Sequence, residues 1–231
     1  AEVVARNMDW LEDLKSNIWV FPRGINREGS AGKNSVKWSS KYGSIITSAY
    51  DICSTDGMNE KNFAGHLLWL AESDYGERDE NIPGLSLSLW LQYFLDNFAY
   101  VNEAINYVEE HPLQTLPVTA GNTGKIAQIH MMIEDSTGDA AILEYIKGKL
   151  EIYHGREYLV MTNDPPFDKQ IECLKQFKGF GGRKSLPGST DSADRFTRAG
   201  YYQKNLPKPN NIRETIAGVI SVARNIAQPF G

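Results

Sequence analysis

Hydrophobic residues in the first 70 positions fall into short runs separated by polar, glycine-containing segments. Short runs rich in β-branched and aromatic side chains are typical of strands. Strands are therefore predicted over 3–5 and 42–50, and further apolar runs lie over 17–21 and 63–70. The small polar residues at 54–57 predict a turn.

The spacing of apolar residues becomes helical after position 84 and returns to alternation after position 125. The helical part predicts helices over 85–95 and 101–110. The alternating part resembles an antiparallel meander with glycine-containing turns, and its strand candidates are 126–135, 140–146, 149–153 and 158–161. Three more helices are predicted over 167–177, 192–205 and 212–227.

This order of elements predicts an α+β fold with mainly antiparallel sheet. Each strand run mixes apolar and polar residues, and several helices have one broad apolar side. The simplest packing that buries these apolar faces is two sheets face to face with helices outside. No repeat or long linker divides residues 1–231, so a single domain is expected.

Composition and charge exclude several classes of function. The chain has 41% hydrophobic and 23% charged residues, which is ordinary for a soluble globular protein. The net charge is −5 and the basic residues are scattered, which argues against a nucleic-acid partner. No apolar run approaches the roughly 20 residues of a membrane span, and no signal peptide is seen.

Histidine and cysteine indicate no metal centre. The four histidines are dispersed without ligand spacing, so no metal site is predicted. Cys53 and Cys173 are too few for a disulfide framework, and the favoured interpretation of both is a small buried hydrophobic residue.

Polar residues stand where three segments change structure. Arg6 and Asp9 follow the first strand, Asn163 precedes a Pro-Pro turn, and Arg195 lies at the start of a helix. In an extended segment Arg6 and Asp9 would meet only at a bend or bulge. Taken singly, each has an ordinary interpretation. Arg6 and Asp9 could be a surface ion pair, Asn163 a turn residue, and Arg195 a solvent-exposed partner of a nearby aspartate.

Together these segments resemble the choloylglycine hydrolase family, the bile salt hydrolases and penicillin V acylases of the N-terminal-nucleophile hydrolase superfamily. The resemblance covers essentially the whole chain. The matching stretches are 5–10, 21–24, 38–43, 55–61, 68–73, 93–98, 161–163 and 186–196. The sequence around Trp69 is more similar to the Gram-negative acylase branch than to the Gram-positive bile salt hydrolases.

The resemblance implies a four-layer αββα sandwich of two mainly antiparallel sheets with outer helices, and hydrolysis of a linear amide without a cofactor. It implies an N-terminal cysteine nucleophile, with Arg6 beside the thiol and Asp9 holding the α-amino group. Asn163 matches the asparagine whose amide contributes to the oxyanion hole, and Arg195 matches a second arginine near the nucleophile. Trp69 matches the position at which relatives have a residue whose backbone N–H donates to the oxyanion.

The nucleophile itself has no counterpart here, because no cysteine precedes Arg6 and the segments around Cys53 and Cys173 do not match it. We therefore expect the 231-residue chain alone to have no amidase turnover and the parent protein to be the enzyme. The alternative is a catalytically silent homologue that binds acyl ligands.

The expected partner is a small N-acyl substrate. Trp69 should narrow the pocket, which favours phenoxyacetyl penicillin or acyl-homoserine lactones, with conjugated bile salts as the alternative. Met8, Trp10 and Trp69 would supply an apolar wall, although ordinary core packing is an equally good interpretation of Trp10. Relatives imply a homotetramer and a periplasmic location, with the cytoplasm as the alternative.

Other motifs favour ordinary interpretations. The glycine-rich stretch 179–185 lacks the Gly-Lys-Ser/Thr ending and the strand of a phosphate loop. The carboxylates Asp9, Glu12 and Asp13 could suggest a glycosidase pair, but a solvated face is favoured. The acidic stretch 72–80 indicates a solvated loop, with a lid at the active-site mouth as the alternative.

Overall fold

The structure, a computed structural model, describes residues 3–121 and 123–228, and these residues form two compact units. The sheet unit is Glu12–Tyr158. The helical unit combines the described parts of Ala1–Leu11 and Leu159–Gly231. The expectation of a single domain stays a prediction.

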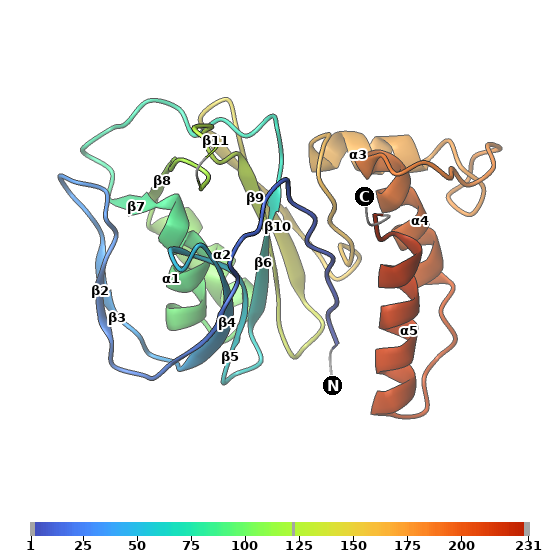
Figure 1. Cartoon of the computed structure of the whole chain (residues 1–231), viewed down its shortest axis with the longest axis horizontal. Coiled ribbons are helices and arrows are strands. Elements are labelled where there is room, and N and C mark those ends of the chain that lie inside the picture. The colour runs from blue at the N-terminus through green and yellow to red at the C-terminus, as the bar shows by residue number, and fades with distance from the viewer. Residues whose placement is uncertain (1–2, 122, 229–231) are drawn as a thin grey trace. The chain divides into compact units, whose positions relative to one another are not determined.

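One large antiparallel sheet dominates the sheet unit (Figure 1). In the described residues its strand order is β1-β4-β5-β6-β9-β10-β11. The bounds are β1 Ile18–Phe21, β4 Ser44–Ala49, β5 Cys53–Asn59, β6 Ala64–Trp69, β9 Ile129–Glu134, β10 Ala140–Ile146 and β11 Lys149–His154. Each neighbouring pair is antiparallel. Short connections favour this direction in the sequential pairs β4–β5, β5–β6, β9–β10 and β10–β11.

Short ladders and two helices complete the sheet unit. The strands β2 (Asn26–Glu28) and β3 (Lys37–Ser39) form a hairpin, and β7 (Gly84–Ser86) pairs in parallel with β8 (Gln114–Leu116). A 3₁₀ turn at Leu87–Leu89 leads into α1 (Trp90–Asn97), which is followed by α2 (Val101–Glu110).

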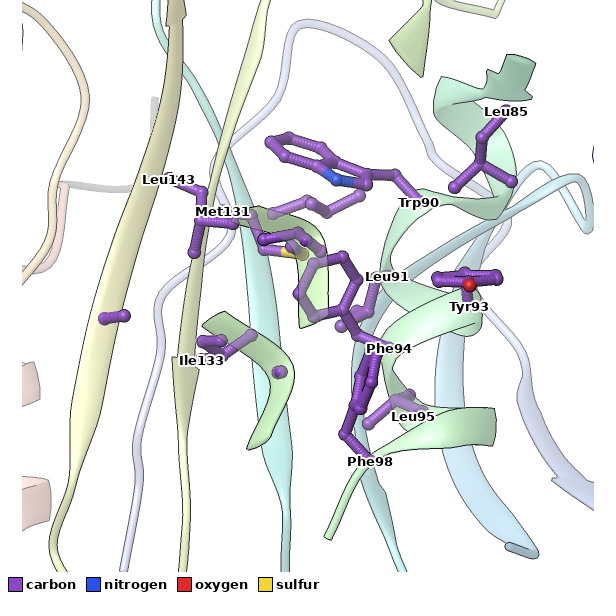
Figure 2. Packing of buried hydrophobic residues seen from close by; sticks show 14 of the residues in the cluster. Leu85, Trp90, Leu91, Tyr93, Phe94, Leu95, Phe98, Met131, Ile133 and Leu143 are labelled. Carbon is purple, nitrogen blue, oxygen red and sulfur yellow. The ribbon is translucent and has the colours of Figure 1, made fainter. Parts of the chain in front are cut away.

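The hydrophobic core lies between these helices and one face of the sheet (Figure 2). Phe94 and Leu95 on α1 pack with Met131, Ile133 and Leu143 from β9 and β10, and all five side chains are almost fully buried. Burying one such side chain contributes about 1.5–3 kcal/mol relative to leaving it exposed. The core therefore fixes α1 and α2 firmly on the sheet.

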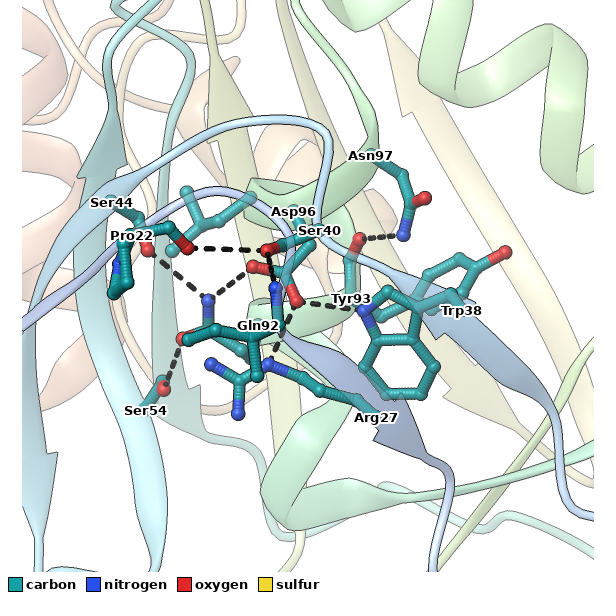
Figure 3. Close-up of polar contacts among 12 residues, drawn as sticks. Pro22, Arg27, Trp38, Ser40, Ser44, Ser54, Gln92, Tyr93, Asp96 and Asn97 are labelled. Carbon is teal, nitrogen blue, oxygen red and sulfur yellow. Dashed lines mark hydrogen bonds and ion pairs between the residues drawn. The ribbon is translucent and has the colours of Figure 1, made fainter.

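Asp96 on α1 anchors the β2–β3 hairpin (Figure 3). Its Oδ2 accepts hydrogen bonds from Arg27 Nε at 2.9 Å and Trp38 Nε1 at 2.7 Å, and these two donors are paired directly across the hairpin. Its Oδ1 accepts from Gln92 Nε2 at 2.8 Å. Burial raises the pKa of Asp96, and the bonds from these donors act against that rise.

The sheet face that α1 does not cover carries a histidine between two carboxylates. His66 on β6 points away from the core because its neighbour Leu67 points into it. Its Nδ1 lies 2.7 Å from Asp56 Oδ1 and its Nε2 lies 2.7 Å from Glu134 Oε1. Burial alone lowers the pKa of His66, but the charge of Glu134 and the bonds to Asp56 and Glu134 outweigh it and raise the pKa to about 10.

This raised pKa predicts a pH-dependent loss of stability. The contribution of His66 is fully present below its unfolded pKa of about 6.5 and is lost as pH rises towards about 10. At pH 6, His66→Gln should cost about 3–5 kcal/mol in urea unfolding, because two carboxylates lose the cation between them. His154→Gln is the matched control, since His154 forms a more exposed pair with Asp139 at 2.9 Å and should change little. Equal losses in both variants would contradict this account of His66.

The helical unit contains α3 (Phe167–Leu174), α4 (Ser192–Lys204) and α5 (Ile212–Asn225). The rings of Phe167 and Phe196 pack edge to face, with centroids 5.8 Å apart, and join α3 to α4. Asn7 Nδ2 donates to the carbonyl oxygen of Ala223 at 2.8 Å, which ties the N-terminal segment to α5. None of the helices in the described ranges is long and apolar enough to cross a membrane.

The predicted α+β class with mainly antiparallel sheet is confirmed. The strands predicted over 3–5 and 158–161 are wrong. Both segments are irregular, and within the described residues neither is paired with a strand.

The turn predicted at 54–57 is also wrong. These residues belong to β5, where a Cβ on Gly57 would lie 2.7 Å from Leu95 Cδ1. Glycine is needed there because α1 packs tightly on the strand.

Candidate functional site

Arg195 holds the side-chain amide of Asn163 in one orientation. Its Nη2 donates to Asn163 Oδ1 at 2.8 Å, and its Nε donates to the carbonyl oxygen of Thr190 at 3.0 Å. A guanidinium group can only donate, so the amide atom that faces it must be the oxygen. The Nδ2 group of Asn163 is consequently turned away from Arg195.

Local sequence explains where these two residues lie. Arg195 is in the first turn of α4, whose start at Asp191 is closed by a bond from the Arg195 N–H to the Asp191 carbonyl oxygen at 2.9 Å. Asn163 precedes Asp164, Pro165 and Pro166, and α3 begins immediately afterwards at Phe167. Proline disfavours helical conformations at the residue before it, so Pro165 keeps Asp164, the residue that follows Asn163, out of a helix.

Asp9 lies close enough to Arg195 to act on it electrostatically. Burial lowers the pKa of Arg195, whereas the carboxylate of Asp9 raises it and the charge of Arg198 lowers it further. Arginine keeps its charge at neutral pH despite such shifts. Asp9, Asn163 and Arg195 are therefore brought together within the helical unit.

The remaining predicted residues of the N-terminal segment lie in the same unit. Arg6 is half-buried and lies three positions before Asp9. Met8 is 39% exposed and Trp10 is half-buried. The whole segment is irregular rather than a bulged strand. The assignment of Arg6 to the thiol, and of Met8 and Trp10 to an acyl wall, stays a prediction.

Trp69 belongs to the other unit. It is the last residue of β6, is half-buried and lies opposite Ile129 of β9. Its role at the oxyanion and in the acyl pocket stays a prediction. Cys53 lies on β5 of the sheet unit and Cys173 on α3 of the helical unit, and both residues are partly buried and form no disulfide within the described part of the chain.

Sequence reasoning missed one residue beside Asn163. Gln170 is 1% exposed, and its Nε2 donates to the carbonyl oxygens of Asn163 and Pro165, each at 2.6 Å. The sequence does contain a signal that Gln170 is buried. Gln170 lies three positions after Phe167, so both side chains are on the same, buried side of α3.

The arrangement suits stabilisation of a negative charge. The described residues contain no group of three or more histidine, cysteine or acidic side chains placed to hold a metal ion. An amide whose oxygen is fixed by a cation presents its N–H₂ group in a defined direction. Such a fixed donor is what a tetrahedral oxyanion needs.

Comparison with known proteins identifies the family. The model of the linear amide C-N hydrolases, choloylglycine hydrolase family, matches residues 1–231. The penicillin V acylase of Pectobacterium atrosepticum is 40% identical over 99% of this chain and 66% of its own length. The bile salt hydrolase/transferase of Clostridium perfringens is 26% identical over 98% of this chain and 75% of its own length.

A solved structure supports the same assignment. The penicillin V acylase from Agrobacterium tumefaciens superposes with a TM-score of 0.88 at 49% identity, covering 98% of this chain and 68% of its own. This likeness confirms the fold class expected from the resemblance. The chain spans about two thirds of the length of the Pectobacterium relative. The chain belongs to the linear amide C-N hydrolases of the choloylglycine hydrolase family.

Proposed function

We propose that this protein, in its full-length form, hydrolyses the amide bond of small N-acyl substrates such as penicillin V. The observation that carries the proposal is the Arg195–Asn163 contact beside Asp9, in a chain that belongs to an amide hydrolase family. The contact fixes an amide donor next to two charged groups of opposite sign, which suits acyl transfer.

The proposed reaction uses a cysteine that is not among the 231 residues. A free α-amine, with a pKa of about 7.7–8.0, takes the thiol proton, and the thiolate attacks the amide carbon. Asp9 orients the amine, and the guanidinium groups of Arg6 and Arg195 favour the thiolate. Asn163 Nδ2 donates to the oxyanion. The amine product leaves with the proton, and water then hydrolyses the thioester to acid and thiol.

One observation and one expectation from the sequence favour penicillin V over bile salts as the substrate class. The two penicillin V acylases are 40% and 49% identical to this chain, whereas the Clostridium bile salt hydrolase/transferase is 26% identical. Trp69, with its large rigid ring, would narrow an acyl pocket and favour flat or linear acyl groups, acyl-homoserine lactones among them. A homotetrameric assembly and a periplasmic location stay predictions.

The full-length protein is expected to hydrolyse penicillin V with a kcat/KM at least about tenfold above that for glycocholate, because even one methylene group that a hydrophobic pocket does not fit changes kcat/KM by about 10–200-fold. Product release measured side by side on both substrates checks this. A preference for glycocholate would assign a bile salt hydrolase. If the full-length protein lacks a processed N-terminal cysteine and binds without turnover, it is a silent acyl-binding homologue.

A further inference from the structure

The backbone of Asn163 is held on both sides by side chains. Its N–H donates to Ser192 Oγ at 2.7 Å, and its carbonyl oxygen accepts from Gln170 Nε2 at 2.6 Å. Asn163 lies in no strand or helix, so no regular ladder supports it. Because both of these bonds come from side chains, the position of Asn163 depends on α3 and α4 together.

A second set of bonds links the two supporting side chains. Thr162 Oγ1 donates to Gln170 Oε1 at 3.1 Å, and Ser192 Oγ donates to Thr162 Oγ1 at 3.0 Å. Thr162 and Gln170 are buried, at 2% and 1% exposure. Gln170 Nε2 also donates to the carbonyl oxygen of Pro165, two residues after Asn163. One amide group therefore bonds to both ends of this turn. Buried polar networks of this kind are rigid when their members are satisfied.

We propose that Gln170 is a positioning residue for catalysis, which together with Ser192 sets the place of the Asn163 amide donor. This inference rests on the proposed function, because it deepens the role of Asn163 as an oxyanion donor. Arg195 fixes the rotation of the amide, and Gln170 and Ser192 fix the peptide that carries it. A misplacement of about 1 Å in such a group can lower a rate by about 100-fold.

The kinetic test uses the full-length enzyme and penicillin V. Gln170→Met keeps the size of the side chain but removes both donated bonds. We expect kcat per titrated acyl-enzyme site to fall about 10–100-fold, with KM within about twofold, because the oxyanion contact acts in the transition state. Ser192→Ala should act in the same direction, and Ser192→Thr, which keeps the hydroxyl group, should restore most of kcat.

The matched control is Gln176→Met. Gln176 follows α3 and is exposed, and its amide contacts Cys173 Sγ and Lys184 Nζ rather than Asn163. It should leave kcat per site within about twofold. A purely structural role of Gln170 would lower Tm and the number of titrated sites but leave kcat per site unchanged. That result would overturn the inference while leaving the proposed function intact.

A second test does not depend on turnover. Hydrogen exchange of the Asn163 backbone amide in the 231-residue chain should become at least about tenfold faster in Gln170→Met and stay unchanged in Gln176→Met. Equal exchange in wild type and Gln170→Met would overturn the positioning role. If the wild-type full-length enzyme cleaves no amide, the proposed function fails, and the catalytic part of the inference fails with it.

Discussion

Asn163→Ala is expected to lower kcat for penicillin V by about 10²–10³-fold in the full-length enzyme, equivalent to about 2.7–4 kcal/mol. The variant removes the amide that Arg195 orients at 2.8 Å, and with it one donor to the oxyanion. KM should change little, because the donor acts on charge that develops only in the transition state. Steady-state kinetics on penicillin V, with the folded fraction measured by circular dichroism, checks both parameters.

Asn205→Ala is the matched control for that experiment. Asn205 follows α4 in the same unit, is exposed, and donates from its amide to the Tyr201 carbonyl oxygen at 2.7 Å. Its kcat should stay within about twofold of wild type. A rise in KM for Asn163→Ala with kcat unchanged would show that Asn163 binds the substrate and the transition state equally well. That result would contradict its role at the oxyanion.

Asp96→Ala is expected to destabilise the sheet unit by about 3–5 kcal/mol, because it leaves three donors without their acceptor. Arg27, Trp38 and Gln92 all donate to this carboxylate, which is fully buried. The loss should appear as a lower urea midpoint without a change in slope. Asp96→Asn, which keeps one acceptor oxygen, should lose less than Asp96→Ala.

The control for Asp96 is an exposed ion pair. Lys33 Nζ and Glu80 Oε2 lie 2.7 Å apart with both side chains largely exposed, so Glu80→Ala should change the urea midpoint little. If Asp96→Ala cost no more than Glu80→Ala, the anchoring of the β2–β3 hairpin through Asp96 would be refuted.

Residue spacing predicts elements well where their partners are close in the sequence. The strand predicted over 140–146 and the helix over 101–110 match β10 and α2, because hairpin neighbours or one buried face stabilise them. The strands predicted over 3–5 and 158–161 do not form. Their β-branched residues favour a strand, but a strand needs a paired neighbour, and local sequence does not contain one.

The candidate site shows the same limit more strongly. Asn163 and Arg195 lie 32 residues apart, and nothing in their local sequence states that a guanidinium would contact that amide. Only the resemblance to a family connected them. Gln170 could have been found from the residues alone, since it interrupts the apolar side of α3 after Phe167. The role expected of Trp69 comes from the resemblance alone, because its local sequence indicates only the end of β6.

A crystal structure of the full-length protein with phenoxyacetate, the acid that penicillin V hydrolysis releases, would test the role of Asn163 as an oxyanion donor most directly. We expect a carboxylate oxygen of phenoxyacetate about 2.7–3.1 Å from Asn163 Nδ2, with Arg195 still bonded to Asn163 Oδ1. A phenoxyacetate carboxylate bound away from Asn163, or an Asn163 amide turned so that its oxygen faces the ligand, would contradict the proposal that Asn163 Nδ2 donates to the oxyanion.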